Sequence, residues 1–108
     1  MKKIIICLIL VLILCGCGKE TEIEKLMREN EYIIIDVRTN DEYNISHVQD
    51  AINIPYDELE NANLDKNKLI FVYCKSGTRS LIAYKTLTKL GYNVYDLGSF
   101  DKIDLPKV

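Results

Sequence analysis

An apolar run that ends at a cysteine and leads into a helical pattern is the feature that most limits the fold of this chain. Leu69 to Tyr73 is an unbroken β-favouring segment, and Cys74 follows it. Residues 75–79 are small, polar or cationic, and from Ser80 to Leu90 apolar residues recur at helical spacing, at positions 82, 83, 87 and 90. A strand, a tight loop and a helix in this order form the basic unit of α/β folds.

Further strand patterns flank this unit. Tyr32 to Val37 is a continuous run of mainly β-branched residues without polar alternation, which indicates a strand covered on both faces, as in a parallel sheet. Ala51–Ile54 is a short strand pattern that stops at Pro55, and Val94–Leu97 is the last such pattern.

Helical signals separate these strand patterns. Thr21 and Glu24 fit a capping box, which predicts a helix that ends near Asn30. Thr39 or Asn40 would cap a short second helix, Tyr56–Leu64 is a helix or turn, and Gly91 stands where a helix-terminating glycine belongs. Because strands and helices alternate, we predict an α/β domain with a mainly parallel central sheet and helices on both faces.

The N-terminal segment has the order of a secretory signal. Two lysines follow Met1, an apolar stretch runs from Ile4 to Leu14, and small residues precede a cysteine at position 17. Residues 14–17 resemble a bacterial lipobox, which implies that residues 1–16 are removed and that Cys17 is lipidated. Residues 17–20 would then be a tether and residues 21–108 the folded domain, held at the extracytoplasmic face of the membrane. Cys15 in the same role, a plain cleaved signal and an uncleaved anchor remain alternatives.

Charge and cysteine content restrict the function. Cleavage before Cys17 would leave Cys74 as the only free thiol, so no disulfide framework could form. Loss of Lys2 and Lys3 would lower the formal net charge from −2 to −4. The sequence shows no basic patch interleaved with aromatic residues, which argues against a nucleic-acid partner.

The loop after Cys74 has the composition of an anion site. Backbone N–H groups of residues 75–80 converge if the loop curls, and the N-terminus of the following helix adds about half a positive charge. Lys75 and Arg79 add cations at the rim, and Gly77 allows a sharp turn. Such surroundings favour the nucleophilic thiolate. The alternative is a buried cysteine that only packs, for which the polar loop is poorly suited.

The loop and several other segments resemble the rhodanese-like sulfurtransferases. Residues 74–80 (CKSGTRS) are similar to the family's active-site loop, residues 35–38 (IDVR) to its I-D-V-R segment, and Glu42-Tyr43 to its E-[FY] pair. Segments 47–55 and 91–98 match two later landmarks in order. Ser46, Asp50 and Ser99 stand where the family usually has glycine, which puts the local loop shape in doubt, not the nucleophile.

This resemblance implies a reaction and a site. Cys74 would accept a sulfur atom and become a persulfide, which the loop residues Lys75, Ser76, Gly77, Thr78, Arg79 and Ser80 would hold. Lys75 and Arg79 would attract thiosulfate or another small anionic sulfur donor, and cyanide or a thiol would then remove the sulfur. The family requires no metal or other cofactor, and we expect a monomer. Asp36, Arg38 and His47 would support the site structurally. The single histidine invites the alternative of a base for Cys74, but the family's histidine at this place is usually structural.

Two other functions compete with sulfur transfer. The domain could be a non-catalytic module that binds a partner or senses oxidised sulfur, with Cys74 as a redox handle. It could also be a small phosphatase or arsenate reductase. The spacing argues against this last reading, because four residues separate Cys74 from Arg79 where the related phosphatases have five, and a larger ring is needed around a tetrahedral anion.

Overall fold

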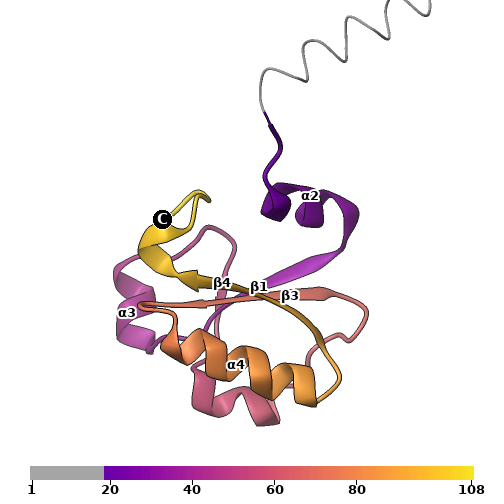
Figure 1. Ribbon diagram of the computed structural model, residues 1–108. Helices are drawn as coiled ribbons and strands as arrows, with labels where there is room; N and C mark the ends of the chain where they lie inside the picture. Colours follow the sequence, from indigo (N-terminus) through magenta and orange to yellow (C-terminus); the bar gives the residue numbers. More distant parts are fainter. Residues whose placement is uncertain (1–18) are drawn as a thin grey trace, which may run out of the picture.

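Four parallel strands form the centre of the domain, as the computed structural model of residues 19–108 shows (Figure 1). They are β1 (Tyr32–Asp36), β2 (Ile52–Asn53), β3 (Leu69–Cys74) and β4 (Asn93–Ser99), in the spatial order β2-β1-β3-β4. All three pairings are parallel, so the predicted α/β class with a parallel sheet is confirmed.

Helices lie on both sides of this sheet. They are α2 (Glu22–Glu29), α3 (Asn40–Ile45) and α4 (Thr78–Lys89), with two 3₁₀ helices, η1 (Tyr56–Asn61) and η2 (Phe100–Lys102). Figure 1 shows α2 on one side of the sheet and α4 on the other. Within residues 19–108 no helix is long and apolar enough to cross a membrane. The predicted signal peptide, residues 1–16, and the proposed lipid site Cys17 lie outside the described residues.

Threonine side chains begin the two N-terminal helices. Thr39 and Glu42 form a complete capping box at α3, in which each side chain bonds the other residue's backbone N–H. At α2 the Thr21 hydroxyl accepts the Glu24 N–H at 3.1 Å and itself bonds the Glu24 carboxylate. The reciprocal backbone bond predicted for Glu24 is therefore replaced by a bond between the two side chains.

The side chains of β3 divide between two cores, which explains why its sequence shows no polar alternation. Ile70, Val72 and Cys74 pack toward α4 and η1, whereas Phe71 and Tyr73 pack toward α2 and the C-terminal segment. Every residue of β3 is buried. A central strand of a parallel sheet has this apolar character on both faces.

Helix α4 begins two residues earlier than its predicted start at Ser80. Gly77, with φ +98°, precedes it in the left-handed conformation. Ala83 and Leu87 are buried as predicted, but Ile82 and Leu90 are 44% and 41% exposed, because the buried stripe follows positions 80, 83 and 87. The predicted helix or turn at residues 56–64 is the shorter η1.

A bulge interrupts the pairing of β3 with β4. Val72 lies opposite Asp96, but Tyr73 lies opposite Gly98, so Leu97 is the extra residue. Gly98 has φ +81°, a conformation that glycine adopts at little cost. As a result Ser99 is the residue opposite Cys74.

Candidate active site

Cys74 is the last residue of β3 and is completely buried. Its Sγ accepts the backbone N–H of Gly77 at 2.9 Å, so the loop folds back over the sulfur. The positive φ of Gly77 makes this return possible and starts α4 directly afterwards. The thiol therefore lies at the meeting point of a strand end and a helix N-terminus, where backbone N–H groups and the helix dipole favour negative charge.

Two serine side chains hold the ends of this loop. Ser80 donates its hydroxyl to the Gly77 carbonyl at 3.1 Å. Ser99, on β4, donates to the Lys75 carbonyl at 2.7 Å. Lys75, Ser76 and Thr78 are exposed, so the predicted loop presents these side chains to solvent above the buried sulfur.

Arg79 is engaged by a carboxylate from another element. Its guanidinium binds Glu42 of α3 through both terminal nitrogens, at 2.8 and 3.2 Å. The hydrogen bond from Arg79 lowers the pKa of Glu42 to about 2. The same bond raises the pKa of Arg79, and the charge of the Cys74 thiolate adds to this effect. The cation expected to attract a donor is thus already paired with an anion.

A buried polar network joins the ends of β1 and β3. Asp36 accepts three bonds from the Arg38 side chain, at 2.6–3.0 Å, and one from the Tyr73 hydroxyl at 2.8 Å. The Tyr73 hydroxyl also accepts the Val48 N–H at 3.0 Å. Burial alone would lower the pKa of Arg38, but the hydrogen bonds and charge of Asp36 outweigh burial, and the pKa of Arg38 is raised. For the Tyr73 hydroxyl, burial itself raises the pKa.

His47 takes part in packing at the end of α3. Its Nδ1 lies 2.9 Å from the Tyr43 carbonyl oxygen, and its ring stacks on that of Tyr43 with centroids 3.8 Å apart. Its backbone exchanges hydrogen bonds with Val108. These contacts tie the end of α3 to the C-terminal segment, and a structural role of His47 in the site stays a prediction.

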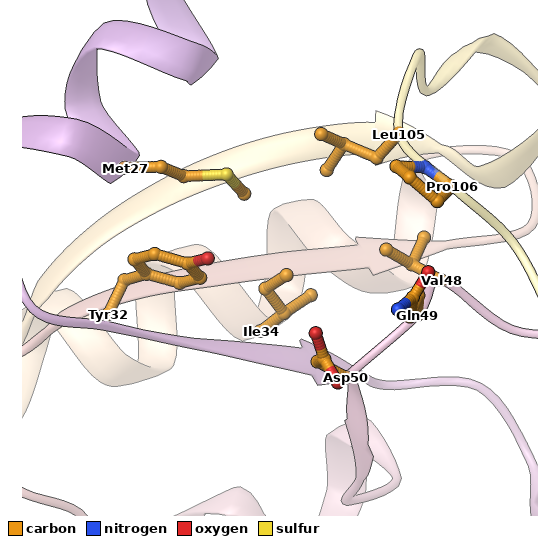
Figure 2. A pocket seen from close by; sticks show the side chains of 8 residues that line it. All are labelled: Met27, Tyr32, Ile34, Val48, Gln49, Asp50, Leu105 and Pro106. Carbon is orange, nitrogen blue, oxygen red and sulfur yellow. The ribbon is translucent and has the colours of Figure 1, made fainter.

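Two of the cavities that residues 19–108 form differ in their relation to the loop, and the first adjoins it. The first has a volume of about 200 Å³, and its walls include Lys75 of the loop together with Arg38, Glu42, Ile45, Ser46, Phe100 and Asp101. The second, of about 230 Å³, lies on the α2 face of the sheet between Met27 and the Leu105–Pro106 segment (Figure 2). It contains no residue of the loop. Within residues 19–108 no three His, Cys, Asp or Glu side chains are grouped as a metal ion would require.

Three residues of the site were not singled out as functional by sequence reasoning. Glu42 was noted only as part of a motif, although its place at the third position of a capping box could have marked it as fixed in space. Tyr73 was treated as part of a strand. Ser99 was noted only as a departure from glycine, and no sequence signal indicates its bond to the loop.

Comparison with known proteins agrees with this geometry. The model of the rhodanese-like domain matches residues 19–104. The chain belongs to the rhodanese-like family. It is 42% identical over 79 residues to the thiosulfate sulfurtransferase PspE of Escherichia coli, in a match that covers 68% of this chain and 76% of that protein.

Other proteins similar to the chain carry different names. The chain is 37% identical over 71 residues to the putative sulfur carrier protein YrkF of Bacillus subtilis, covering 64% of this chain and 38% of that protein. It is 35% identical to a probable molybdopterin-synthase adenylyltransferase of Porphyra purpurea, of which it spans about a fifth.

A solved structure shares the fold. A rhodanese with anions from Escherichia coli superposes with a TM-score of 0.66 at 40% identity, covering 71% of this chain and 96% of that one. The rhodanese-like fold predicted from the sequence is therefore confirmed, and membership in a sulfurtransferase family is supported.

Proposed function

We propose that this protein is a sulfurtransferase that carries a sulfur atom as a persulfide on Cys74. The observation that carries the proposal is the hydrogen bond from the Gly77 N–H to the Cys74 sulfur, inside a loop that opens a helix. The 42% identity to a thiosulfate sulfurtransferase supports it. The partners would be a small anionic sulfur donor and a thiophilic acceptor.

The reaction would proceed in two half-reactions through one covalent intermediate. The Cys74 thiolate attacks the outer sulfur of thiosulfate, a new S–S bond forms, the old one breaks, and sulfite leaves with the bonding electron pair. The protein then carries a persulfide anion. Cyanide or a thiolate attacks the terminal sulfur, takes it as thiocyanate or a new persulfide, and restores the Cys74 thiolate.

The loop geometry fits the charges that these steps create. The terminal persulfide sulfur carries negative charge, and the backbone N–H groups of the loop, one of them on Gly77, stabilise such charge without reorganisation. Lys75 is exposed at the rim and can attract an anionic donor. The short loop between Cys74 and Arg79 has the size to enclose a single transferred sulfur atom.

The test is formation of thiocyanate from thiosulfate and cyanide by the purified domain from Gly18 onward. We expect turnover in the wild type and at least a thousandfold loss in Cys74→Ser, which keeps the size of the side chain but removes the nucleophile. Polysulfide and mercaptopyruvate are tested as further donors. Absence of transfer from all three donors would refute the proposal.

A second candidate is a binding or sulfur-sensing module. Complete burial of Cys74 favours it, because access to the sulfur requires passage through the loop. Mass spectrometry separates the two functions. A persulfide that forms on Cys74 and stays in the presence of excess acceptor would indicate a sensor or carrier, whereas its rapid discharge indicates a transferase.

We also propose, from the sequence of the N-terminal segment, that Cys17 is the site of lipid attachment and that the domain faces away from the cytoplasm. In a bacterial host fed with labelled palmitate, the full chain should take up label, and Cys17→Ala should not. Equal labelling of Cys17→Ala with loss in Cys15→Ala would move the site to Cys15, and no labelling of the wild type would refute the anchor.

A further inference from the structure

We propose that Glu42 is a positioning residue that holds the Arg79 guanidinium next to the Cys74 sulfur during sulfur transfer. The inference rests on the proposed function and deepens it, because it assigns a role to a residue outside the loop. Glu42 belongs to α3, which follows β1, whereas Arg79 belongs to the first turn of α4. The pair joins two helices that begin at the same edge of the sheet, beyond the carboxyl ends of β1 and β3.

The Glu42 carboxylate is itself fixed in place. It accepts the backbone N–H of Thr39 at 3.2 Å and the Thr39 hydroxyl at 3.1 Å, in the capping box that starts α3. The same carboxylate accepts two guanidinium bonds from Arg79. An arginine side chain has many rotamers, and a bidentate bond to an anchored carboxylate selects one of them.

The fold and the charges bring Arg79 close to the sulfur. Arg79 lies in the first turn of α4, two residues after Gly77, whose N–H bonds the Cys74 sulfur at 2.9 Å. Its bond to Glu42 raises the pKa of Arg79, and the same bond lowers the pKa of Glu42 to about 2, so the pair is ionised at every pH at which a sulfurtransferase would be assayed. Both side chains are only 26% exposed, which limits screening by salt.

The two cations of the loop therefore have different roles. Lys75 is exposed, so it contributes to long-range attraction of the donor and affects the KM for thiosulfate. Arg79 is held by Glu42, so it stabilises charge on the sulfur in both half-reactions. Loss of Glu42 should consequently lower kcat/KM for thiosulfate and for cyanide alike, whereas Lys75→Ala should mainly raise the KM for thiosulfate.

Glu42→Gln is the informative variant. Glutamine can still serve as the third residue of a capping box, so α3 keeps its start, but it cannot form the charged bidentate pair. Asp41→Asn is the matched control, since it removes the same charge one residue earlier from an exposed side chain. Thr21→Ala is the structural control, because it removes the cap of α2 and leaves Glu42, its Thr39 anchor and Arg79 intact.

A double-mutant cycle tests whether Glu42 acts through Arg79. We expect Glu42→Gln to lower both kcat/KM values about tenfold in the wild-type background and less than twofold in an Arg79→Ala background. Asp41→Asn and Thr21→Ala should each change them less than threefold. A tenfold loss that persists in the Arg79→Ala background would overturn the proposal, and so would an equal loss in Thr21→Ala.

A readout without turnover separates this inference from the proposed function. The rate at which iodoacetamide alkylates Cys74 at pH 7, followed by mass spectrometry of the loop peptide, reports how well the thiolate is stabilised. If Glu42 holds Arg79 in place, Glu42→Gln reacts about threefold more slowly than the wild type. If Glu42 acted only by its own repulsion of the thiolate, the variant would react faster. A protein that transfers no sulfur but shows the slower alkylation would refute the proposed function and retain the positioning role, and an unchanged or faster rate would refute the role.

Discussion

Tyr73→Phe removes one oxygen atom from the buried polar network at the ends of β1 and β3. The Tyr73 hydroxyl donates to the Asp36 carboxylate at 2.8 Å and accepts the Val48 N–H at 3.0 Å. Tyr73 and Asp36 are fully buried and Val48 is 1% exposed, so water does not replace the lost bonds. Phenylalanine fits the same space, and therefore the change isolates the two hydrogen bonds from packing.

The magnitude follows from what each partner loses. A hydrogen bond to an ionised carboxylate contributes about 1.5–3 kcal/mol, and a buried N–H left without a partner costs about 1–3 kcal/mol. Asp36 retains its bonds from Arg38, which moderates the first contribution. We therefore expect the free energy of unfolding to fall by about 3 kcal/mol, from a typical range of roughly 5–15 kcal/mol for a single domain. The variant should remain folded in water.

Guanidinium unfolding followed by far-UV circular dichroism measures this loss. The midpoint should move to lower denaturant concentration while the slope m stays the same. Tyr84→Phe is the control, because Tyr84 is 37% exposed and its hydroxyl has no hydrogen bond within residues 19–108, so it should change stability by less than about 0.5 kcal/mol. A loss below about 1 kcal/mol in Tyr73→Phe would show that the network does not stabilise the domain as argued.

Other predictions concern stability at the loop and in the core. Gly77→Ala and Gly98→Ala should each lower the free energy of unfolding by about 1–2 kcal/mol in thermal unfolding, because φ values of +98° and +81° are strained for alanine. No atom lies within 4 Å of either added Cβ, so a steric clash adds nothing. A loss above about 4 kcal/mol would contradict this reasoning. In denaturant titrations, Leu87→Ala should lower the free energy of unfolding by about 2–5 kcal/mol, because Leu87 is fully buried. Ile82→Ala should lower it by less than about 1 kcal/mol, because Ile82 is 44% exposed. Similar losses in the two variants would contradict the assigned faces of α4. The pKa of Glu42 in the folded state lies below its ordinary value of 4.5, so the ion pair stabilises the fold above pH 4.5 and this stabilisation disappears as the pH falls toward 2. Across this window the free energy of unfolding should fall by about 1–2 kcal/mol more in the wild type than in Glu42→Gln. Parallel curves of stability against pH for the two proteins would refute the ion pair.

The order of elements could be predicted from sequence because each signal is local. The run from Leu69 to Cys74 and the threonine caps depend on neighbouring residues only, and the structure confirms them. The buried face of α4 was predicted in part, since Ile82 and Leu90 are apolar yet lie beside the stripe that contacts the sheet. Only the tertiary arrangement decides which apolar residues of a helix are covered.

The candidate site likewise has a part that the sequence predicts and a part that it does not. The loop around Cys74 could be recognised because its residues are consecutive. The pairing of Arg79 with Glu42 and of Tyr73 with Asp36 joins residues 37 positions apart. The first pair depends on how α3 and α4 meet, and the second on how β1 and β3 lie side by side. Spacing in one sequence carries no information on such contacts.

The bulge in β4 decides which residue of that strand lies beside the cysteine loop. Because Leu97 is taken up as an extra residue, Ser99 stands opposite Cys74 and its hydroxyl reaches the Lys75 carbonyl. If Leu97 continued the regular ladder opposite Tyr73, Gly98 would lie opposite Cys74, and Ser99 would turn to the other face of the sheet. A cysteine loop grafted between this chain and others should therefore be transferred together with the end of the last strand, since the two are separate in sequence but joined by this hydrogen bond.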